Sequence, residues 1–147
     1  MRPGGAYFMH TDAFVMIRGG HLDLALLGAF EVSGSGDLAN WTTGDRRFPP
    51  GVGGAMDLAV GAKAIWVLTE HTSKKGEPKI VDKCKYPLTA AGVVRKIFTD
   101  LAEIDVTPAG LVVRAMVEGL DLPALQALTE PRLTLAAGCR VMAAPAA

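Results

Sequence analysis

Two apolar runs, with a glycine turn and a helix-like segment between them, constrain the fold of this chain most strongly. Leu22–Val32 and Ala64–Thr69 hold few polar residues, as do strands that are buried on both faces of a parallel sheet. Between them, the turn Gly51–Gly54 precedes Ala55–Ala62, whose Ala, Met, Leu and Val residues predict a helix. This order predicts a right-handed βαβ unit, and therefore an α/β fold with a mostly parallel sheet and flanking helices.

Local capping signals predict three further helices. Thr11 is expected to cap a helix over Asp12–Arg18, in which the acidic residue stands at the N-terminal end and the basic residue at the C-terminal end. Thr89 is expected to cap a helix over Ala90–Phe98, where apolar residues recur at helical spacing. Asp121 is expected to cap the last helix of the chain.

The remaining segments predict short strands and two loops. A strand is expected within residues 79–86, and Ala102–Thr107 and Leu111–Val117 should form a hairpin at the sheet edge or two adjacent strands. Glu70–Pro78 is charged, which favours a solvated surface loop. Ser33–Pro50 is a long polar connection, and connections of that length in compact domains are usually functional.

The chain is long enough for one domain with a sizeable core. Of its 147 residues, 50% are hydrophobic and 20% are charged, which argues against disorder. We expect the domain to span residues 1–131 and the Ala-rich residues 132–147 to form a mobile tail.

Charge and hydropathy exclude several classes of partner. The chain has 15 basic and 15 acidic residues, so its zero net charge gives no electrostatic case for binding nucleic acid or an anionic membrane. No apolar run approaches the roughly 18 residues that span a bilayer, and the first residues lack the apolar core of a signal peptide. We therefore expect a cytoplasmic protein without nucleic-acid or membrane partners.

The glycine turn is the strongest candidate for chemistry in the chain. Glycines at Gly51, Gly53 and Gly54 let a ligand approach bare backbone, and the free N–H groups that follow suit an oxyanion or a phosphate. A dinucleotide fingerprint fails, because its third glycine would fall at Met56. A phosphate loop fails too, because Lys63 is not followed by serine or threonine. An ordinary strand-to-helix turn remains the alternative.

Histidines and cysteines give no metal or redox motif. His10, His21 and His71 lack ligand spacing, so each is predicted to be a surface or helix-end histidine and no metal site is expected. Cys84 and Cys139 lie far apart without a CxxC spacing, which favours free thiols. No serine stands in the GxSxG context of a nucleophile elbow.

Eight runs of residues together resemble one known family. They occur in order and without large gaps between Gly5 and Pro131, and they resemble the B subunit of the family I 3-oxoacid CoA-transferases. The runs are Ala13–Leu24, Leu27–Ala29, Gly36–Trp41, Gly53–Leu58, Glu70–His71, Pro87–Thr89, Thr99–Ala102 and Asp105–Pro108.

The resemblance implies the CoA-transferase fold, also called NagB/RpiA-like, and a ping-pong reaction. In such enzymes CoA moves between succinyl-CoA and a 3-oxoacid, acetoacetate or 3-oxoadipate, through a glutamyl-CoA thioester. The family has no permanently bound cofactor, because coenzyme A is part of the substrate. The resemblance also implies an A subunit as partner, and therefore a hetero-oligomer.

By the same resemblance, the glycine turn forms the oxyanion site. The second glycine of the family's GGAMD run places its backbone N–H at the oxyanion, which makes Gly54 the expected catalytic residue here. Gly53 and Ala55 on either side of it are expected to contact substrate. Asn40 matches a family position beside the thioester and is expected to orient it.

The chain departs from the family at the nucleophile. The family's glutamate lies in a Glu-Asn-Gly motif N-terminal to the region that matches Gly5–Phe8, and this chain contains no such motif. Neither Glu31 nor Glu70 replaces it by motif. We therefore expect an N-terminally truncated or mis-started B subunit that is inactive alone. The alternatives are a catalytically dead interaction or regulatory subunit of the same fold, and a sugar-phosphate isomerase of similar fold, which the GGAMD match weakens.

Overall fold

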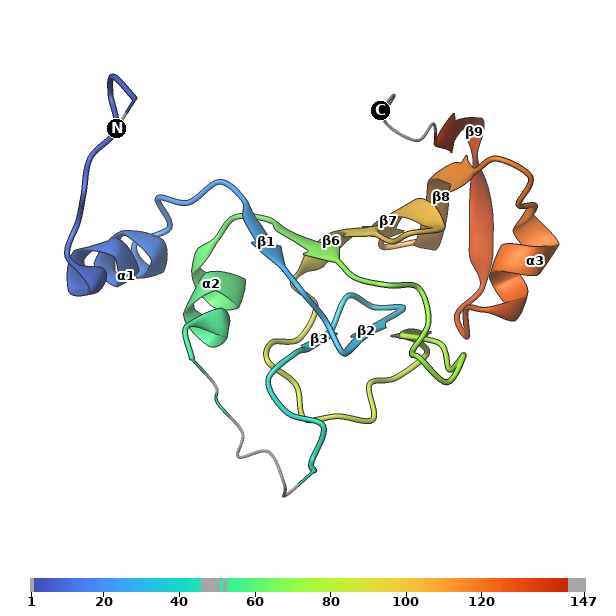
Figure 1. The fold of residues 1–147 in the computed structure, drawn as a ribbon, viewed down its shortest axis with the longest axis horizontal. Coiled ribbons are helices and arrows are strands. Elements are labelled where there is room, and N and C mark those ends of the chain that lie inside the picture. The colour runs from blue at the N-terminus through green and yellow to red at the C-terminus, as the bar shows by residue number, and fades with distance from the viewer. Residues whose placement is uncertain (1, 46–50, 52, 143–147) are drawn as a thin grey trace.

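The structure, a computed structural model, describes residues 2–45, 51 and 53–142. Among them, a six-stranded sheet runs across the molecule, a three-stranded sheet lies below it in Figure 1, and helices stand at both ends. In chain order the elements are α1 (His10–Arg18), β1 (Ala25–Leu27), β2 (Glu31–Ser33), β3 (Leu38–Ala39), α2 (Ala55–Gly61), β4 (Ile65–Leu68), β5 (Ile80–Val81), β6 (Val94–Phe98), β7 (Ala102–Thr107), β8 (Gly110–Val117), α3 (Leu122–Ala127) and β9 (Leu133–Met142).

The large sheet confirms the α/β prediction. Its strand order is β1-β4-β6-β7-β8-β9, in which β1, β4 and β6 are parallel neighbours and β8 pairs with β9 in parallel. The pairs β6–β7 and β7–β8 are antiparallel. Strands β1 and β4 are the two partners of the predicted βαβ unit, and α2 lies between them in sequence. The sheet is therefore mostly parallel, with an antiparallel hairpin inside it.

The apolar run Leu22–Val32 is not one strand, which corrects the prediction. Its first part, β1, belongs to the large sheet, and its last part, β2, pairs with β3 and β5 in the small sheet. The chain changes sheets at Gly28, whose carbonyl accepts a hydrogen bond from Asn40 Nδ2 at 3.1 Å. Leu26 is also 58% exposed, so β1 is not buried on both faces. Hydropathy alone could not locate this break.

The predicted helix over Ala90–Phe98 is wrong, because most of this segment forms β6. This strand fills the position between β4 and β7, so its backbone groups pair on both sides. Val94 and Ile97 are fully buried there, and such β-branched residues suit a strand. Thr89 caps nothing. It is buried and donates its hydroxyl proton to Asn40 Oδ1 at 2.6 Å.

Strand β9 corrects the prediction of a mobile tail for residues 133–142. It pairs with β8 along most of its length, so the β7–β8 hairpin lies inside the sheet rather than at its edge. Most side chains of β9 are at least partly exposed, as expected of an edge strand. Residues 143–147 lie outside the described residues, and the domain boundary at residue 131 stays a prediction.

Two of the predicted caps differ in outcome. Asp121 caps α3 as predicted, since its Oδ1 accepts the Ala124 N–H at 2.9 Å. Thr11 does not cap α1, because this helix already begins at His10, with Met9 as an N-cap that makes no side-chain bond. Helix α2 is confirmed at Ala55–Gly61.

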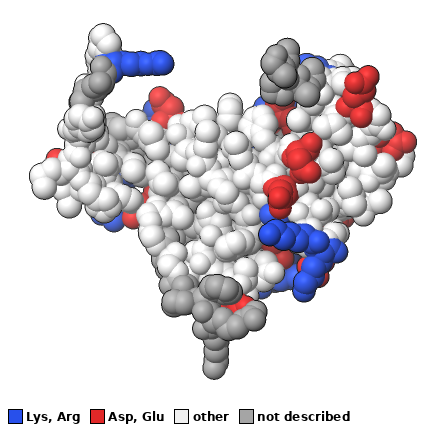
Figure 2. Space-filling model, in the orientation of Figure 1, with Lys and Arg blue, Asp and Glu red and all other residues white. Residues whose placement is uncertain are grey.

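The core is built from residues of the large sheet together with residues of the small sheet, α2 and α3. Ile65, Val67, Ile97, Ile104 and Val113 from neighbouring strands are 1% exposed or less. On the face seen in Figure 2, basic and acidic side chains lie near one another rather than in a field of one sign. Among the described residues, no helix is long and apolar enough to cross a membrane.

Candidate functional site

The glycine turn leads directly into α2. Gly54 is the N-cap of the helix, and its carbonyl accepts the Leu58 N–H at 3.1 Å. Gly53 has φ +52°, a left-handed conformation that disfavours a side chain. The N–H groups of Gly54 and Ala55 donate no hydrogen bond to the described residues.

Gly54 is also where α1 and α2 come together. A Cβ atom added there would lie 2.7 Å from Cε1 of Phe14, far inside van der Waals contact. Gly61 at the other end of α2 lies similarly against Ile17 of α1. Gly54 and Gly61 thus both allow close helix packing. Gly54 has a packing role regardless of any chemistry.

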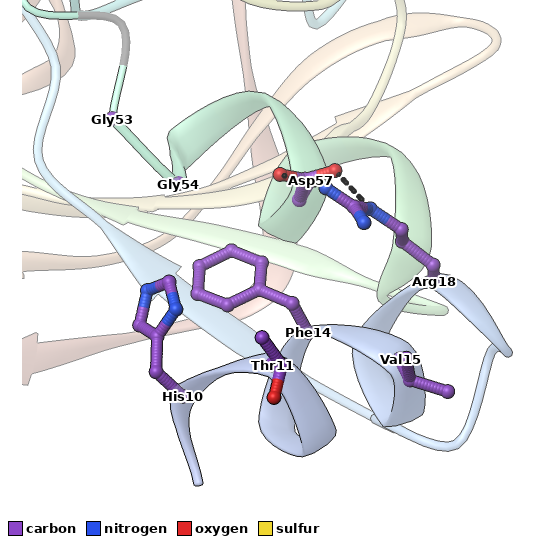
Figure 3. A pocket seen from close by; sticks show the side chains of 8 residues that line it. All are labelled: His10, Thr11, Phe14, Val15, Arg18, Gly53, Gly54 and Asp57. Atoms are coloured by element: carbon purple, nitrogen blue, oxygen red, sulfur yellow. Dashed lines mark hydrogen bonds and ion pairs between the residues drawn. The ribbon is translucent and has the colours of Figure 1, made fainter.

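A cavity of about 550 Å³ opens where the turn faces α1, and we call it the Gly54 cavity. Figure 3 shows the rings of His10 and Phe14 side by side near the turn, with centroids 4.7 Å apart. The cavity is lined by His10, Thr11, Phe14, Val15, Arg18, Gly53, Gly54 and Asp57.

An ion pair at one end of the Gly54 cavity ties the two helices. Arg18 Nε and Nη2 donate to the two carboxylate oxygens of Asp57 at 2.7 and 3.1 Å, as Figure 3 shows. This two-point hydrogen bond lowers the pKa of Asp57 and raises the pKa of Arg18. Both side chains are partly exposed, Arg18 at 63% and Asp57 at 28%. The cavity therefore has one charged but internally neutralised wall.

Asn40 stands apart from the Gly54 cavity. Its Oδ1 accepts the hydroxyl proton of Thr89, its Nδ2 donates to Gly28 O, and its backbone N–H donates to Thr89 Oγ1 at 3.1 Å. Both ends of its side-chain amide thus already have partners within the chain. The amide holds the β1–β2 junction to the start of the segment that precedes β6.

The structure brings together only some of the predicted site residues. Gly53 and Gly54 line the cavity, whereas Ala55 and Asn40 do not. The sequence analysis did not single out Phe14, or the pairing of Arg18 with Asp57. Arg18 and Asp57 do carry opposite charges and lie in two of the runs that match the family. However, the two residues are 39 apart in sequence, and no local sequence pattern predicts that they meet.

His71 is fully buried, which corrects the prediction of a surface histidine. Its Nδ1 lies 3.0 Å from Thr99 Oγ1, its Nε2 lies 2.9 Å from Thr129 Oγ1, and its backbone N–H donates to Asp100 Oδ1 at 2.7 Å. Thr129 already donates its hydroxyl proton to Leu125 O, so Nε2 must be the donor to Thr129. We call these four residues, His71, Thr99, Asp100 and Thr129, the His71 junction.

Burial keeps His71 neutral. Desolvation lowers its pKa, and the charge of Asp100 offsets this only in part. With the proton on Nε2, Nδ1 is an acceptor, and the single hydroxyl proton of Thr99 is shared between Nδ1 at 3.0 Å and Ala102 O at 3.3 Å. The junction joins the loop after β4, the β6–β7 turn and the segment between α3 and β9.

The two cysteines are free thiols, and Cys84 is an unreactive one. Burial, together with the nearby charges of Glu31 and Asp37, raises the pKa of the Cys84 thiol to about 11. Almost none of it is thiolate at neutral pH. No cluster of three or more His, Cys, Asp or Glu side chains that could hold a metal occurs among the described residues.

Comparisons with known proteins point to one family. Residues 1–124 match the Coenzyme A transferase family. The chain is 57% identical over 129 residues to the B subunit of the 3-oxoadipate CoA-transferase of Acinetobacter baylyi, which covers 88% of this chain and 59% of that protein. It is 45% identical over 128 residues to the B subunit of the succinyl-CoA:3-ketoacid coenzyme A transferase of Helicobacter pylori, covering 87% and 61%. The chain thus spans less than two thirds of either relative.

Solved structures show the same fold at low identity. An acyl-CoA transferase from Escherichia coli O157:H7 superposes with a TM-score of 0.78 at 18% identity, over 94% of this chain and 31% of that one. The decarboxylase AibA/AibB gives 0.73 at 20% identity, over 97% and 60%. At these identities the likeness extends to the fold alone.

Proposed function

Because the chain belongs to the Coenzyme A transferase family, we propose that it forms part of a transferase that moves CoA between succinyl-CoA and a 3-oxoacid, acetoacetate or 3-oxoadipate. The observation that carries this proposal is the 57% identity to the B subunit of a 3-oxoadipate CoA-transferase. The proposed partner is an A subunit, since both relatives above are named as B subunits. The proposed compartment is the cytoplasm.

The proposed reaction needs a carboxylate and an oxyanion donor. A glutamate oxygen attacks the thioester carbonyl, the carbon–sulfur bond breaks, and CoA thiolate leaves an acid anhydride behind. The thiolate then attacks the glutamyl carbonyl, which releases the first acid and leaves a glutamyl-CoA thioester. The second acid takes up CoA by the reverse of these steps. Negative charge develops on a carbonyl oxygen each time.

Gly54 is the proposed donor to that oxyanion. Its N–H has no partner among the described residues, it lines a cavity of about 550 Å³, and it corresponds to the second glycine of the family's GGAMD run. Gly53 and Ala55 are the proposed substrate contacts beside it. Asn40 is proposed to act indirectly, because both ends of its amide are engaged with Thr89 and Gly28.

The nucleophile is proposed to come from outside these 147 residues, since no Glu-Asn-Gly motif occurs in them. A binding turn stabilises charge but cannot hold CoA covalently. The same observation favours a second candidate function, a catalytically dead interaction or regulatory subunit. The two candidates differ in whether the chain becomes active when the glutamate is supplied.

This difference can be measured. The chain is extended at its N-terminus by a family segment with the Glu-Asn-Gly motif, mixed with an A subunit, and incubated with succinyl-CoA and acetoacetate. We expect acetoacetyl-CoA to form, and intact mass spectrometry to show a CoA adduct on the extended chain. The 147-residue chain, treated in the same way, should show neither.

Two results would decide against this assignment. Turnover by the unextended chain with a CoA adduct on Glu31 or Glu70 would place the nucleophile inside it. A folded, fully assembled and extended complex without turnover would favour the inactive subunit.

A further inference from the structure

The large sheet has one face whose side chains lie outside the core, and we call it the outer face. Residues that pair across neighbouring strands point to the same side of a sheet, and so do residues two apart in one strand. Ile65, Val67, Ile97 and Ile104 belong to the core on one side. On the other side, paired residues form two rows across β1, β4, β6 and β7, which are Leu26, Trp66, Lys96 and Asp105, and then Leu68, Phe98 and Glu103.

The end of the outer face at β1 and β4 is apolar and uncovered. Leu26 is 58% exposed and Leu68 is 50% exposed. Trp66 and Phe98 beside them are half-buried, with ring centroids 5.4 Å apart. Strands β1, β4 and β6 are parallel, and parallel strands are normally buried on both faces. This end of the sheet therefore lacks a covering layer in the part of the chain that the structure describes.

The end of the outer face at β7, β8 and β9 is charged, and its charges are paired within the chain. Lys96 Nζ donates to Glu103 Oε1 at 2.6 Å and lies 3.2 Å from Asp105 Oδ1. Arg114 Nε donates to Asp105 Oδ2 at 2.6 Å. Arg140 Nη2 donates to Glu103 Oε2 at 2.8 Å. These charges therefore need no partner from outside the chain.

An apolar patch beside paired charges has the composition of a protein interface. Lys96 joins the two ends of the outer face, because its Nζ lies 5.6 Å from the ring centroid of Trp66 and 5.5 Å from that of Phe98. Exposed apolar patches with a polar rim mark sites of association, and tryptophan is enriched in them. Because the rim holds both signs of charge, it does not select a strongly acidic or basic partner. The outer face therefore suits a partner that is flat, apolar and nearly neutral.

We propose that a second copy of this chain covers the outer face, so that two chains pack face to face as a symmetric dimer. A two-fold axis through the patch brings the same apolar side chains of both copies together and leaves the charged ends at the rim. The copy presents the flat, apolar and mixed-charge surface that the patch suits. With 15 basic and 15 acidic residues in each chain, two copies carry no net charge that would repel them. The proposal does not rest on the proposed transferase function.

The size of the outer face predicts a weak and reversible dimer. The sheet is 6-stranded, and strands about 4.8 Å apart with about six residues of about 3.3 Å each give a face of roughly 500 Å². Two such faces amount to about 1,000 Å², which is at the lower limit of specific interfaces. We therefore expect a dissociation constant of about 10–100 μM.

Sedimentation of the 147-residue chain in the analytical ultracentrifuge measures this directly. Between about 1 μM and about 500 μM we expect a monomer to convert into a dimer and into no larger species. Leu68→Lys should raise the dissociation constant at least about tenfold, because it places an ammonium group in an apolar interface. Leu68 is half exposed in the single chain, so this variant should stay folded, which circular dichroism checks.

Leu135→Lys is the matched control for the outer face. Leu135 is also 50% exposed, but it pairs with the buried Val113 and therefore lies on the opposite side of the sheet. This variant should dimerise as the unchanged chain does. Salt at about 1 M should not dissociate the dimer, because its contacts are apolar and its ion pairs lie within each chain.

Three results would overturn the proposal. The first is a chain that stays monomeric at every concentration, which would leave the outer face to a different partner. The second is a dimer that Leu68→Lys and Leu135→Lys affect equally, which would place the contact elsewhere on the molecule. The third is growth into larger assemblies, since a closed two-fold contact stops at two chains.

Discussion

The Gly54 cavity and the His71 junction both join segments far apart in sequence, but by opposite means. Around Gly54, the exposed ion pair of Arg18 with Asp57 and the close approach of Phe14 to a residue without a side chain hold α1 against α2. At His71, a buried side chain has a hydrogen-bond partner for each ring nitrogen. Exposed contacts of the first kind are worth little each, whereas buried polar networks are costly to disturb. Losing the exposed ion pair at the cavity should therefore cost little stability, whereas losing a buried partner at the junction should cost more.

The largest expected effect follows from Gly54→Ala in the extended enzyme with its A subunit. The new methyl group collides with Phe14 and displaces the N–H that we propose as oxyanion donor. Losing one such donor costs about 3 kcal/mol, so turnover should fall about a hundredfold. Turnover by the assembled enzyme is the measurement.

Phe14→Ala with Gly54→Ala separates collision from chemistry. Removing the Phe14 ring gives the new methyl group space. Gly54→Ala should therefore cost less stability in the Phe14→Ala background than it costs in the unchanged chain. The deficit in turnover should persist if the N–H position matters. Full recovery of turnover in the double variant, beyond that of Phe14→Ala alone, would reduce Gly54 to a packing role.

Acidification should weaken the His71 junction next. The pKa of His71 in the folded chain lies below its ordinary value of 6.5, so the unfolded chain binds the proton first as pH falls. The stability that depends on neutral His71 is complete above pH 6.5 and is lost as pH falls from there towards the folded pKa. The slope is at most about 1.4 kcal/mol per pH unit for one proton.

Urea unfolding at about pH 7.5 and about pH 5, on either side of the ordinary histidine pKa, measures this effect. His71→Asn removes the titrating group, so this variant should be less stable at the higher pH but lose less stability on acidification. An equal loss in both chains would show that other groups cause it. His10→Asn, at an exposed histidine, is the matched control and should keep the full pH dependence.

The contrast also explains what the sequence could predict. The glycine turn, α2 and the β1–β4 pair follow local signals and were predicted, as was the cap at Asp121. Strand β6 was missed, because Val94 and Ile97 fit a helical period and only pairing with β4 and β7 makes the segment a strand. β9 was missed because its Ala-rich sequence shows no alternation and is ordered by β8.

For the site, as for the fold, the sequence indicated the residues that belong to local patterns and missed those that depend on contacts between distant segments. Gly53 and Gly54 were singled out because glycine patterns are local; both line the Gly54 cavity, and their roles stay predictions. The Phe14 contact, the Arg18–Asp57 pair and the burial of His71 depend on how distant segments meet, and no spacing in one sequence encodes that. The role of Asn40 beside the thioester stays a prediction, and within the chain its side-chain amide bonds Thr89 and Gly28.

Asn40→Ala should have a smaller effect than Gly54→Ala. It removes two side-chain hydrogen bonds in a half-buried place, and net losses are about 1 kcal/mol for each such bond. Thermal unfolding of Asn40→Ala and of Thr89→Val alone and together measures the coupling. A strongly non-additive result is expected. Additive losses would mean that the 2.6 Å contact between the two side chains contributes nothing to stability. A roughly hundredfold loss of turnover in Asn40→Ala, with unchanged stability, would instead support direct contact of Asn40 with the thioester.

Arg18→Ala should have the smallest effect on stability. Arg18 is mostly exposed, so water replaces the hydrogen bonds to Asp57 and salt screens their charge. The melting temperature should therefore change little, and raising the salt concentration to about 1 M should change it no further. Lys63→Ala is the control: Lys63 is as exposed as Arg18, its partner Asp23 is more exposed than Asp57, and the variant should likewise lose little stability. A large loss of stability in Arg18→Ala alone would show that the α1–α2 contact depends on this pair rather than on the packing of Phe14 against Gly54.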